Sequence, residues 1–167
     1  MNSRASVLFA IIEFVAVAGC RKSVQLAGGM APTIKTGEQV TIDYLAYSVG
    51  APRRWDVVAF ESAGMPLPSN SMFLKRIIAL PLETISLTSS GIVVNGTILT
   101  MPAALSNVVY CPPEKLPSPQ MNGLVAFPYT VPPRHYFVVG DNWANSYDSR
   151  YYGAVPMTNI LGLVRNK

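Results

Sequence analysis

After Ser23, the hydrophobic residues of the chain fall in short runs separated by Gly, Pro, Asn and Ser. Runs this short, rich in Val, Ile, Tyr and Phe and without helical periodicity, are typical of β-strands. We therefore expect a mainly β, antiparallel fold that is partly closed into a barrel-like sheet. The predicted strands are residues 39–44, 56–61, 73–79, 84–88, 92–94, 97–100, 124–128, 136–140 and 160–165.

Two local signals add detail to this pattern. Asn95 and Gly96 separate two apolar runs, and an Asn-Gly pair favours a type I′ hairpin because both central residues of that turn need a positive φ. Between residues 101 and 133 the chain has many prolines and little periodicity. We interpret this section as a Pro-rich, partly extended excursion that wraps the surface of the β domain.

The N-terminal segment has a different pattern. Residues 7–19 are apolar except for Glu13, and as a hydrophobic helix they would span about 20 Å, less than the roughly 30 Å of a bilayer core. Three interpretations remain open: a short signal anchor with the β domain on the extracytoplasmic side of the cell membrane, a cleaved lipoprotein-type signal ending before Cys20, or a buried helix of a soluble protein. We assign residues 1–22 to an anchor or signal-like segment and residues 23–167 to the β domain.

The composition limits the kinds of molecule that this protein is expected to bind. Hydrophobic residues make up 50% of the chain and charged residues 13%, which excludes a disordered chain and indicates a surface poor in charge. The net charge of +4 comes without any basic run, so it suits an anionic membrane lipid surface and does not favour nucleic acid. Cys20, Cys111 and the single His135 are too few for a zinc site or a disulfide framework. The sequence implies no cofactor and no metal.

Gly28 and Gly29 begin the first of three motifs with candidate chemistry, Gly-Gly-Met-Ala-Pro-Thr. Adjacent glycines allow a tight turn or a close approach of the backbone to a ligand. Taken alone, the motif also fits an ordinary turn before a strand.

The second motif places Lys75 and Arg76 inside the apolar run 73–79. Alternation along a strand puts these two cations on opposite faces, so one of them must lie against apolar side chains. Lys75 shares a face with Phe73 and Ile77, and loss of hydration there could lower its pKa toward the range that a general base needs. A lysine that extends its amine past a strand edge into water also fits the segment.

The third motif follows the apolar run 136–140 and reads Gly-Asp-Asn-Trp-Ala-Asn-Ser-Tyr-Asp-Ser-Arg over residues 140–150. Short polar side chains at this density bind neighbouring backbone in loops. Asp148 and Arg150 are two residues apart, so in an extended chain they point the same way and could pair. The spacing of a calcium loop is absent, which leaves only a weak case for a metal site.

The order of these three motifs closely resembles the bacterial type I signal peptidase family, which are membrane serine proteases with a Ser/Lys dyad. The resemblance spans about residues 25–164. It implies a signal-peptidase-type β domain that removes signal peptides from exported preproteins. By position it implies Lys75 as general base, Ser146 as the residue that orients Lys75, Met30 and Ala27 as substrate-binding positions, and Asp141, Asn142, Asp148 and Arg150 as structural support.

Gly29 departs from the family pattern at the position of the nucleophile. Where the family has serine directly before Met30, this chain has a residue without a side-chain oxygen, so it cannot form an acyl-enzyme. Ala27, at a position that the family ties to the oxyanion hole, also lacks a hydroxyl. We expect a signal-peptidase-like protein with little or no peptidase activity. Two alternatives are a non-catalytic peptide-binding module of the export pathway and a relative of the peptidases of conjugative pilin maturation.

Overall fold

Short strands joined by turns make up most of the described chain. A computed structural model describes residues 14–17, 19–116 and 123–165. The strands are β1 (Phe14–Val17), β2 (Cys20–Val24), β3 (Gln39–Asp43), β4 (Val57–Glu61), β5 (Met72–Ala79), β6 (Thr84–Thr88), β7 (Gly91–Val94), β8 (Thr97–Ile98), β9 (Tyr129–Thr130), β10 (His135–Val139), β11 (Val155–Pro156) and β12 (Ile160–Arg165). The helical turns are η1 (Gly28–Met30), η2 (Ala103–Leu105), η3 (Pro113–Lys115), η4 (Trp143–Asn145), α2 (Ser149–Tyr152) and η5 (Met157–Asn159).

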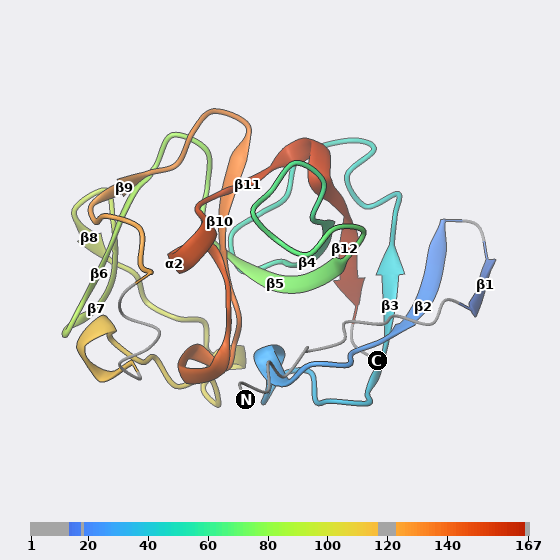
Figure 1. Cartoon of the computed structure of the whole chain (residues 1–167), viewed down its shortest axis with the longest axis horizontal. Helices are drawn as coiled ribbons and strands as arrows, with labels where there is room; N and C mark the ends of the chain where they lie inside the picture. The colour runs from blue at the N-terminus through green and yellow to red at the C-terminus, as the bar shows by residue number, and fades with distance from the viewer. Residues whose placement is uncertain (1–13, 18, 117–122, 166–167) are drawn as a thin grey trace, which may run out of the picture.

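The strands form two antiparallel sheets (Figure 1). The larger sheet has the order β1-β2-β3-β12-β4-β5-β10-β11, and the smaller sheet has the order β8-β7-β6-β9. Strand β5 curves through the middle of the molecule, with the smaller sheet on one side of it and β12, β3 and β2 on the other. The predicted mainly β, antiparallel fold is therefore confirmed, and the curl of the large sheet gives it a partly barrel-like form.

Strand β5 is buried on both faces. It pairs with β4 on one edge and β10 on the other, and every residue from Phe73 to Ala79 is buried. Both Lys75 and Arg76 are only 7% exposed, although the sequence required burial of only one of them. The two side chains point to opposite faces of the sheet, so each must find its own compensation for lost hydration.

Most strand predictions are confirmed with nearly the same bounds. Asn95 and Gly96 both have a positive φ, 50° and 78°, and Val94 pairs with Thr97 across the turn, as a type I′ hairpin requires. β8 ends at Ile98 instead of Thr100.

The predicted strand at residues 124–128 is wrong. The chain there is irregular, and the strand in this section is the two-residue β9, which pairs with β6. Pro128 has no N–H to donate to a ladder, and the Val125 N–H donates to the carbonyl of Arg150 instead. A run of apolar residues is therefore not sufficient to form a strand where its backbone N–H groups are absent or donate elsewhere.

The predicted N-terminal hydrophobic helix is not confirmed. Residues 1–13 and 18 lie outside the described residues, and the described part of the segment, Phe14–Val17, is strand β1. β1 pairs with β2, with Phe14 opposite Lys22 and Val17 opposite Cys20. In residues 14–17, 19–116 and 123–165, no helix has the length and apolar character needed to cross a membrane.

The Pro-rich section is partly packed into the core. Leu105 and Val108 are buried in a cluster with Ile85 of β6, Phe137 of β10 and Trp143. Residues 117–122 of this section lie outside the described residues. The described part of the section is thus tied to both sheets through apolar contacts.

Candidate active site

The first and third motifs are joined by hydrogen bonds. The Asn142 backbone N–H donates to the Gly29 carbonyl at 3.1 Å, and the Asn142 side-chain amide donates to the Gly28 carbonyl at 3.1 Å. The Thr33 hydroxyl donates to the Asp141 carboxylate. Segments more than 100 residues apart in the sequence are therefore fixed to each other, and the position of η1 depends on the loop after β10.

Arg76 ties the second motif to the same loop. Its guanidinium makes two hydrogen bonds to the Asp141 carboxylate, Nε to Oδ1 at 2.8 Å and Nη2 to Oδ2 at 2.6 Å. Its Nη1 donates to the Trp55 carbonyl at 2.7 Å. Paired hydrogen bonds of this geometry fix orientation as well as distance. Because neighbouring residues of a strand face opposite ways, anchoring Arg76 at Asp141 also directs Lys75 to the other side of β5.

Lys75 and Gly29 meet on that other side. A Cβ added at Gly29 would lie 3.2 Å from the Lys75 Nζ and 3.6 Å from the Ser146 Oγ. A side chain at position 29 would therefore point directly at the amine and the hydroxyl. The two positions of the dyad, Gly29 and Lys75, and the orienting residue Ser146 come together, although they lie in η1, β5 and the loop after β10.

The absence of a side chain at Gly140 lets Ser146 and Gly29 lie close together. A Cβ at position 140 would overlap both the Ser146 Oγ and the Gly29 carbonyl oxygen. Gly140 lies directly after β10, so its missing side chain lets the third motif fold back against η1. Gly140 begins the third motif in the sequence, but its place directly before Asp141 was the only signal of this role.

A buried ion pair holds the third motif. Arg150 donates to Asp148 through Nε at 2.7 Å and Nη2 at 2.8 Å, and both side chains are fully buried. Asp148 also accepts from the Gly140 N–H at 3.0 Å, and Arg150 Nη2 reaches the Ser146 carbonyl at 3.2 Å. The pair thus connects the residues on both sides of Ser146. The predicted pairing of Asp148 and Arg150 is present, at the start of helix α2.

Burial changes the acidity of the Lys75 amine. Loss of hydration is the largest effect and lowers the pKa of Lys75, the positive charge of Arg150 lowers it further, and the negative charges of Asp148 and Asp141 oppose this. Across the described residues, Lys75 makes no side-chain hydrogen bond or ion pair. The Ser146 Oγ is also buried without a hydrogen-bond partner among these residues. The amine and the hydroxyl are both free to interact with a bound group.

A groove opens beside these residues. Its volume is about 530 Å³. It is lined by Leu26, Ala27, Gly28, Gly29, Leu67, Pro68, Phe73, Lys75, Asn145, Ser146 and Tyr147. Of the two predicted substrate-binding positions, Ala27 lines the groove. The structure does not bring Met30 into the groove, because its side chain is fully buried in a core cluster with Ile34 and Leu74.

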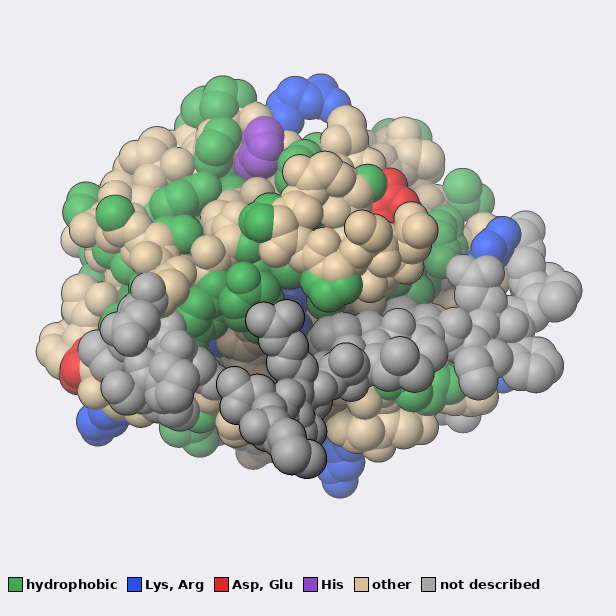
Figure 2. Space-filling view, viewed as in Figure 1, with side chains coloured by type: hydrophobic (Ala, Val, Ile, Leu, Met, Phe, Trp, Pro, Cys, Tyr) green, Lys and Arg blue, Asp and Glu red, His purple; other side chains and the backbone are tan. Residues whose placement is uncertain are grey.

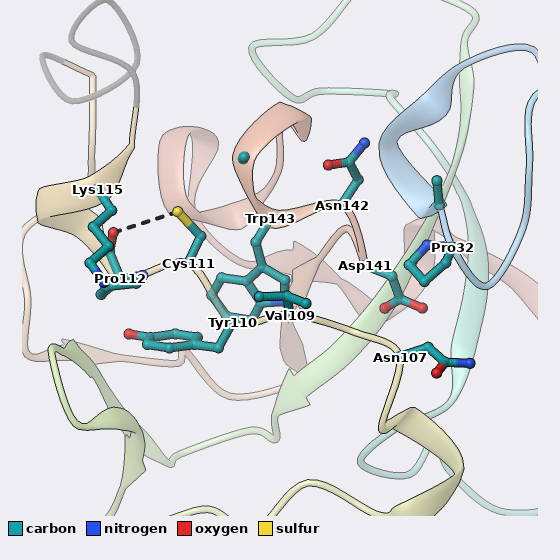
Figure 3. A pocket seen from close by; sticks show the side chains of 12 residues that line it. Pro32, Asn107, Val109, Tyr110, Cys111, Pro112, Lys115, Asp141, Asn142 and Trp143 are labelled. Carbon is teal, nitrogen blue, oxygen red and sulfur yellow. Dashed lines mark hydrogen bonds between the residues drawn. The ribbon is translucent and has the colours of Figure 1, made fainter.

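A second hollow, of about 610 Å³, lies against Asp141 and Asn142 (Figure 3). Tyr110, Cys111 and Lys115 from the Pro-rich section line its other wall, and the Cys111 thiol faces the Pro112 carbonyl. Neither Lys75 nor Gly29 lines this hollow. Within the described residues no cluster of His, Cys, Asp and Glu could hold a metal ion.

Comparisons with known proteins identify the family of this chain. The family model described as signal peptidase, peptidase S26, matches residues 3–166. A signal peptidase I from Leptolyngbya laminosa is 34% identical over 137 residues, which cover 80% of this chain and 61% of the relative. A signal peptidase I from Bacillus caldolyticus is 31% identical over 144 residues, which cover 81% of this chain and 71% of the relative.

A solved structure shows the same fold. The crystal structure of a signal peptidase I from Enterococcus faecalis aligns with a TM-score of 0.50 at 30% identity, over 70% of this chain and 99% of that one. This chain spans 61% of the length of the Leptolyngbya laminosa relative and 57% of the length of a probable signal peptidase I-2 from Synechocystis. The matched residues, the fold and the meeting of three distant motifs show that the chain belongs to the signal peptidase family, peptidase S26.

Proposed function

We propose that this chain binds the signal-peptide region of exported preproteins in the groove beside Lys75 and cleaves it with little or no activity. The groove supports binding, because apolar walls formed by Leu67, Phe73 and Tyr147 fit the small side chains that the family recognises. The extended backbone at Ala27 supports the entry of substrate as an added strand.

The chemistry supports the loss of cleavage. In the family reaction a serine oxygen attacks the scissile carbonyl while the neutral lysine accepts its proton. Here burial lowers the pKa of the Lys75 amine, and Lys75 and Ser146 both lie beside the position of a Cβ at Gly29, but Gly29 offers no oxygen to form the acyl-enzyme. What remains is binding and whatever stabilisation backbone N–H groups give to an oxyanion. The observation that carries the proposal is the 3.2 Å approach of the Gly29 Cβ position to the Lys75 Nζ.

The test is restoration of the missing oxygen. Gly29→Ser should cleave a preprotein or an Ala-x-Ala peptide at least about 10³-fold faster than the unmodified chain, as expected when a nucleophile is restored to an otherwise complete site. Gly29→Ala is the matched control, because it adds the same Cβ without the oxygen. Cleavage by the unmodified chain within about tenfold of the serine variant would overturn the proposal.

The second candidate function is that of a non-catalytic peptide-binding module of the export pathway, which holds the peptide and has no peptidase role. The retained groove and the unpartnered Ser146 hydroxyl favour it, since both would serve a bound peptide even without a nucleophile. Calorimetric titration of the unmodified chain with an uncleaved Ala-x-Ala peptide tests it directly. Saturable heat that disappears on Phe73→Asp would support a peptide-binding module, and no heat would count against it. A relative of pilin-maturation peptidases would instead prefer a pilin precursor in the same titration.

The cellular location is also a proposal. The apolar residues 7–19 and the surface poor in charge support an N-terminal membrane anchor with the β domain on the extracytoplasmic side. Figure 2 shows one face on which hydrophobic and uncharged side chains predominate. The alternative is a lipoprotein attached through Cys20. Metabolic labelling with a fatty acid, compared with Cys20→Ser, distinguishes the two, since only lipidation requires the thiol.

A further inference from the structure

We propose that the Lys75 amine is itself a nucleophile that captures aldehydes as an imine in the groove. This goes beyond the proposed function, in which Lys75 would only accept a proton. The chemical class of ligand is an aldehyde carrying a short apolar group.

Glycine at position 29 leaves the Lys75 amine accessible from the groove. In a chain with serine at position 29, that side chain would stand between the groove and the amine, because its Cβ would lie 3.2 Å from Nζ. With glycine there, Lys75 and Gly29 both form part of the groove wall. A small carbonyl carbon can therefore approach the nitrogen through the space that the serine side chain would occupy.

The Lys75 amine lies beside apolar side chains of the groove. Phe73, Leu67 and Pro68 line the same groove, so an apolar group bound there displaces water from the nitrogen. A desolvated lysine in an apolar pocket is the type that forms Schiff bases with carbonyl compounds. Burial lowers the pKa of Lys75. Lys22, Lys35 and Lys115 are exposed, so water surrounds their amines, and none of them lines this groove.

The Ser146 hydroxyl, which has no hydrogen-bond partner among the described residues, can donate to a ligand beside the amine. Its Oγ is buried and 3.6 Å from the position of a Cβ at Gly29, so it faces the same small space as the amine. A carbonyl bonded to Lys75 would place its oxygen within reach of this donor. Ser146 is then a positioning residue that stabilises the oxygen during addition.

The reaction balances with these groups alone. The nitrogen lone pair forms a bond to the carbonyl carbon, the C=O π electrons move to oxygen, and a proton passes from nitrogen to that oxygen to give a carbinolamine. The nitrogen lone pair then forms C=N as the C–O bond breaks, and the remaining N–H proton joins the departing hydroxide to give water. An amine and an aldehyde thus give an imine and one water, with no oxidation or reduction.

The experiment traps the imine. The full chain is incubated at pH 7 with propanal and sodium cyanoborohydride, which reduces C=N to a stable secondary amine, and peptide mass spectrometry locates the adduct. We expect Lys75 to be modified at least tenfold faster than Lys22, Lys35 or Lys115 in the same molecules. Equal modification of all these lysines, or none at Lys75, would overturn the proposal.

Two variants separate access from nucleophilicity. Lys75→Met should lose the adduct at this position, and Gly29→Val, which keeps the amine but fills the space before it, should slow modification of Lys75 at least tenfold. An undiminished rate in folded Gly29→Val would overturn the argument from access. Ser146→Ala should slow the reaction while leaving its site unchanged.

A second probe distinguishes this proposal from the proposed function. An Ala-x-Ala peptide ending in an aldehyde needs peptide binding in the groove, whereas propanal does not. Modification by propanal but not by the peptide aldehyde would support the reactive amine and contradict peptide binding. Peptide binding detected by calorimetry, without any adduct at Lys75, would support the proposed function and contradict the reactive amine.

Discussion

At the scale of single residues, the Lys75 amine governs how stability depends on pH. Its folded pKa is lowered mainly by burial, against an ordinary value of about 10.4 in the unfolded chain. Between these two values the unfolded state binds more protons than the folded state, so stability should rise with pH in that window. Asp148, Arg150 and Asp141 are the charged groups that act on this amine.

Lys75→Met should therefore raise the melting temperature near pH 7, because Met keeps most of the side-chain volume and removes the cost of burying an amine. For a chain of this size 1 kcal/mol corresponds to about 2–4 °C, and we expect a rise of at least this size. The advantage should shrink as pH approaches about 10.4, where the unfolded lysine also loses its proton. Thermal unfolding from pH 7 to 10 measures it, with exposed Lys35→Met as the control. A difference that does not change with pH would contradict the explanation.

Single residues also limit what the sequence could predict about the site. Lys75 and Ser146 were assigned through the resemblance, and the structure brings both to Gly29. Met30 follows Gly29 directly but packs into the core, because consecutive residues of η1 point in different directions. Arg76 was noted only as a cation in a strand. Its partner Asp141 is 65 positions away, and no local pattern fixes the register of β5 against β10.

At the scale of structural elements, the loop after β10 holds the site by two means: close backbone packing at Gly140 and the buried pair of Asp148 and Arg150. The sequence predicted β10 and the pair, since one depends on an apolar run and the other on two residues at short spacing. It could not predict the packing at Gly140, because that depends on η1, which lies more than 100 residues earlier. Strand β9 was misplaced for a similar reason, as its partner β6 selects which residues pair.

Gly140→Ala tests the close packing. The added methyl would overlap the Ser146 Oγ and the Gly29 carbonyl, so the loop must move, at a cost of about 1–3 kcal/mol for overpacking. In the Gly29→Ser background the same change should abolish the restored cleavage, because η1 would shift away from Lys75. Gly123→Ala is the matched control, since its methyl would meet only Tyr151 Cδ1 at 3.7 Å. Equal melting temperatures for the two alanine variants would contradict this explanation.

Asp148→Asn tests the buried pair. It leaves the Arg150 guanidinium fully buried without a counter-charge, and breaking such a pair costs about 3–5 kcal/mol. Asp43→Asn is the control, because its partner Arg165 is 57% exposed and water screens an exposed pair, so its loss should cost far less. Urea unfolding of both variants measures the difference. The explanation is contradicted if the two substitutions cost the same.

At the scale of the whole molecule, the two sheets share one core. Ile78 of β5 and Phe137 and Val139 of β10 belong to the large sheet, yet they pack in the same cluster as Ile85 and Leu87 of β6. Strands β5 and β10 also carry Lys75 and lead into the third motif, so the strands that shape the site are the ones that join the sheets. We therefore expect the described part of the β domain to unfold as one unit.

A matched pair of core substitutions tests this expectation. Ile85 in the small sheet and Ile42 in the large sheet are both 0% exposed, and Ile→Ala at either position should cost about 2–5 kcal/mol. Trp143 and Trp55 both pack in the cluster that contains Ile85, so tryptophan fluorescence reports on that cluster alone. Circular dichroism measures the cost of each substitution to the whole β domain. If the sheets are coupled, the drop in the urea midpoint seen by fluorescence must stand in the same proportion to that cost for Ile42→Ala as for Ile85→Ala. If instead Ile42→Ala leaves that midpoint unchanged, the cluster around Ile42 unfolds separately from the cluster that holds both tryptophans. The geometry around Lys75 would then depend only on local contacts of β5 and β10.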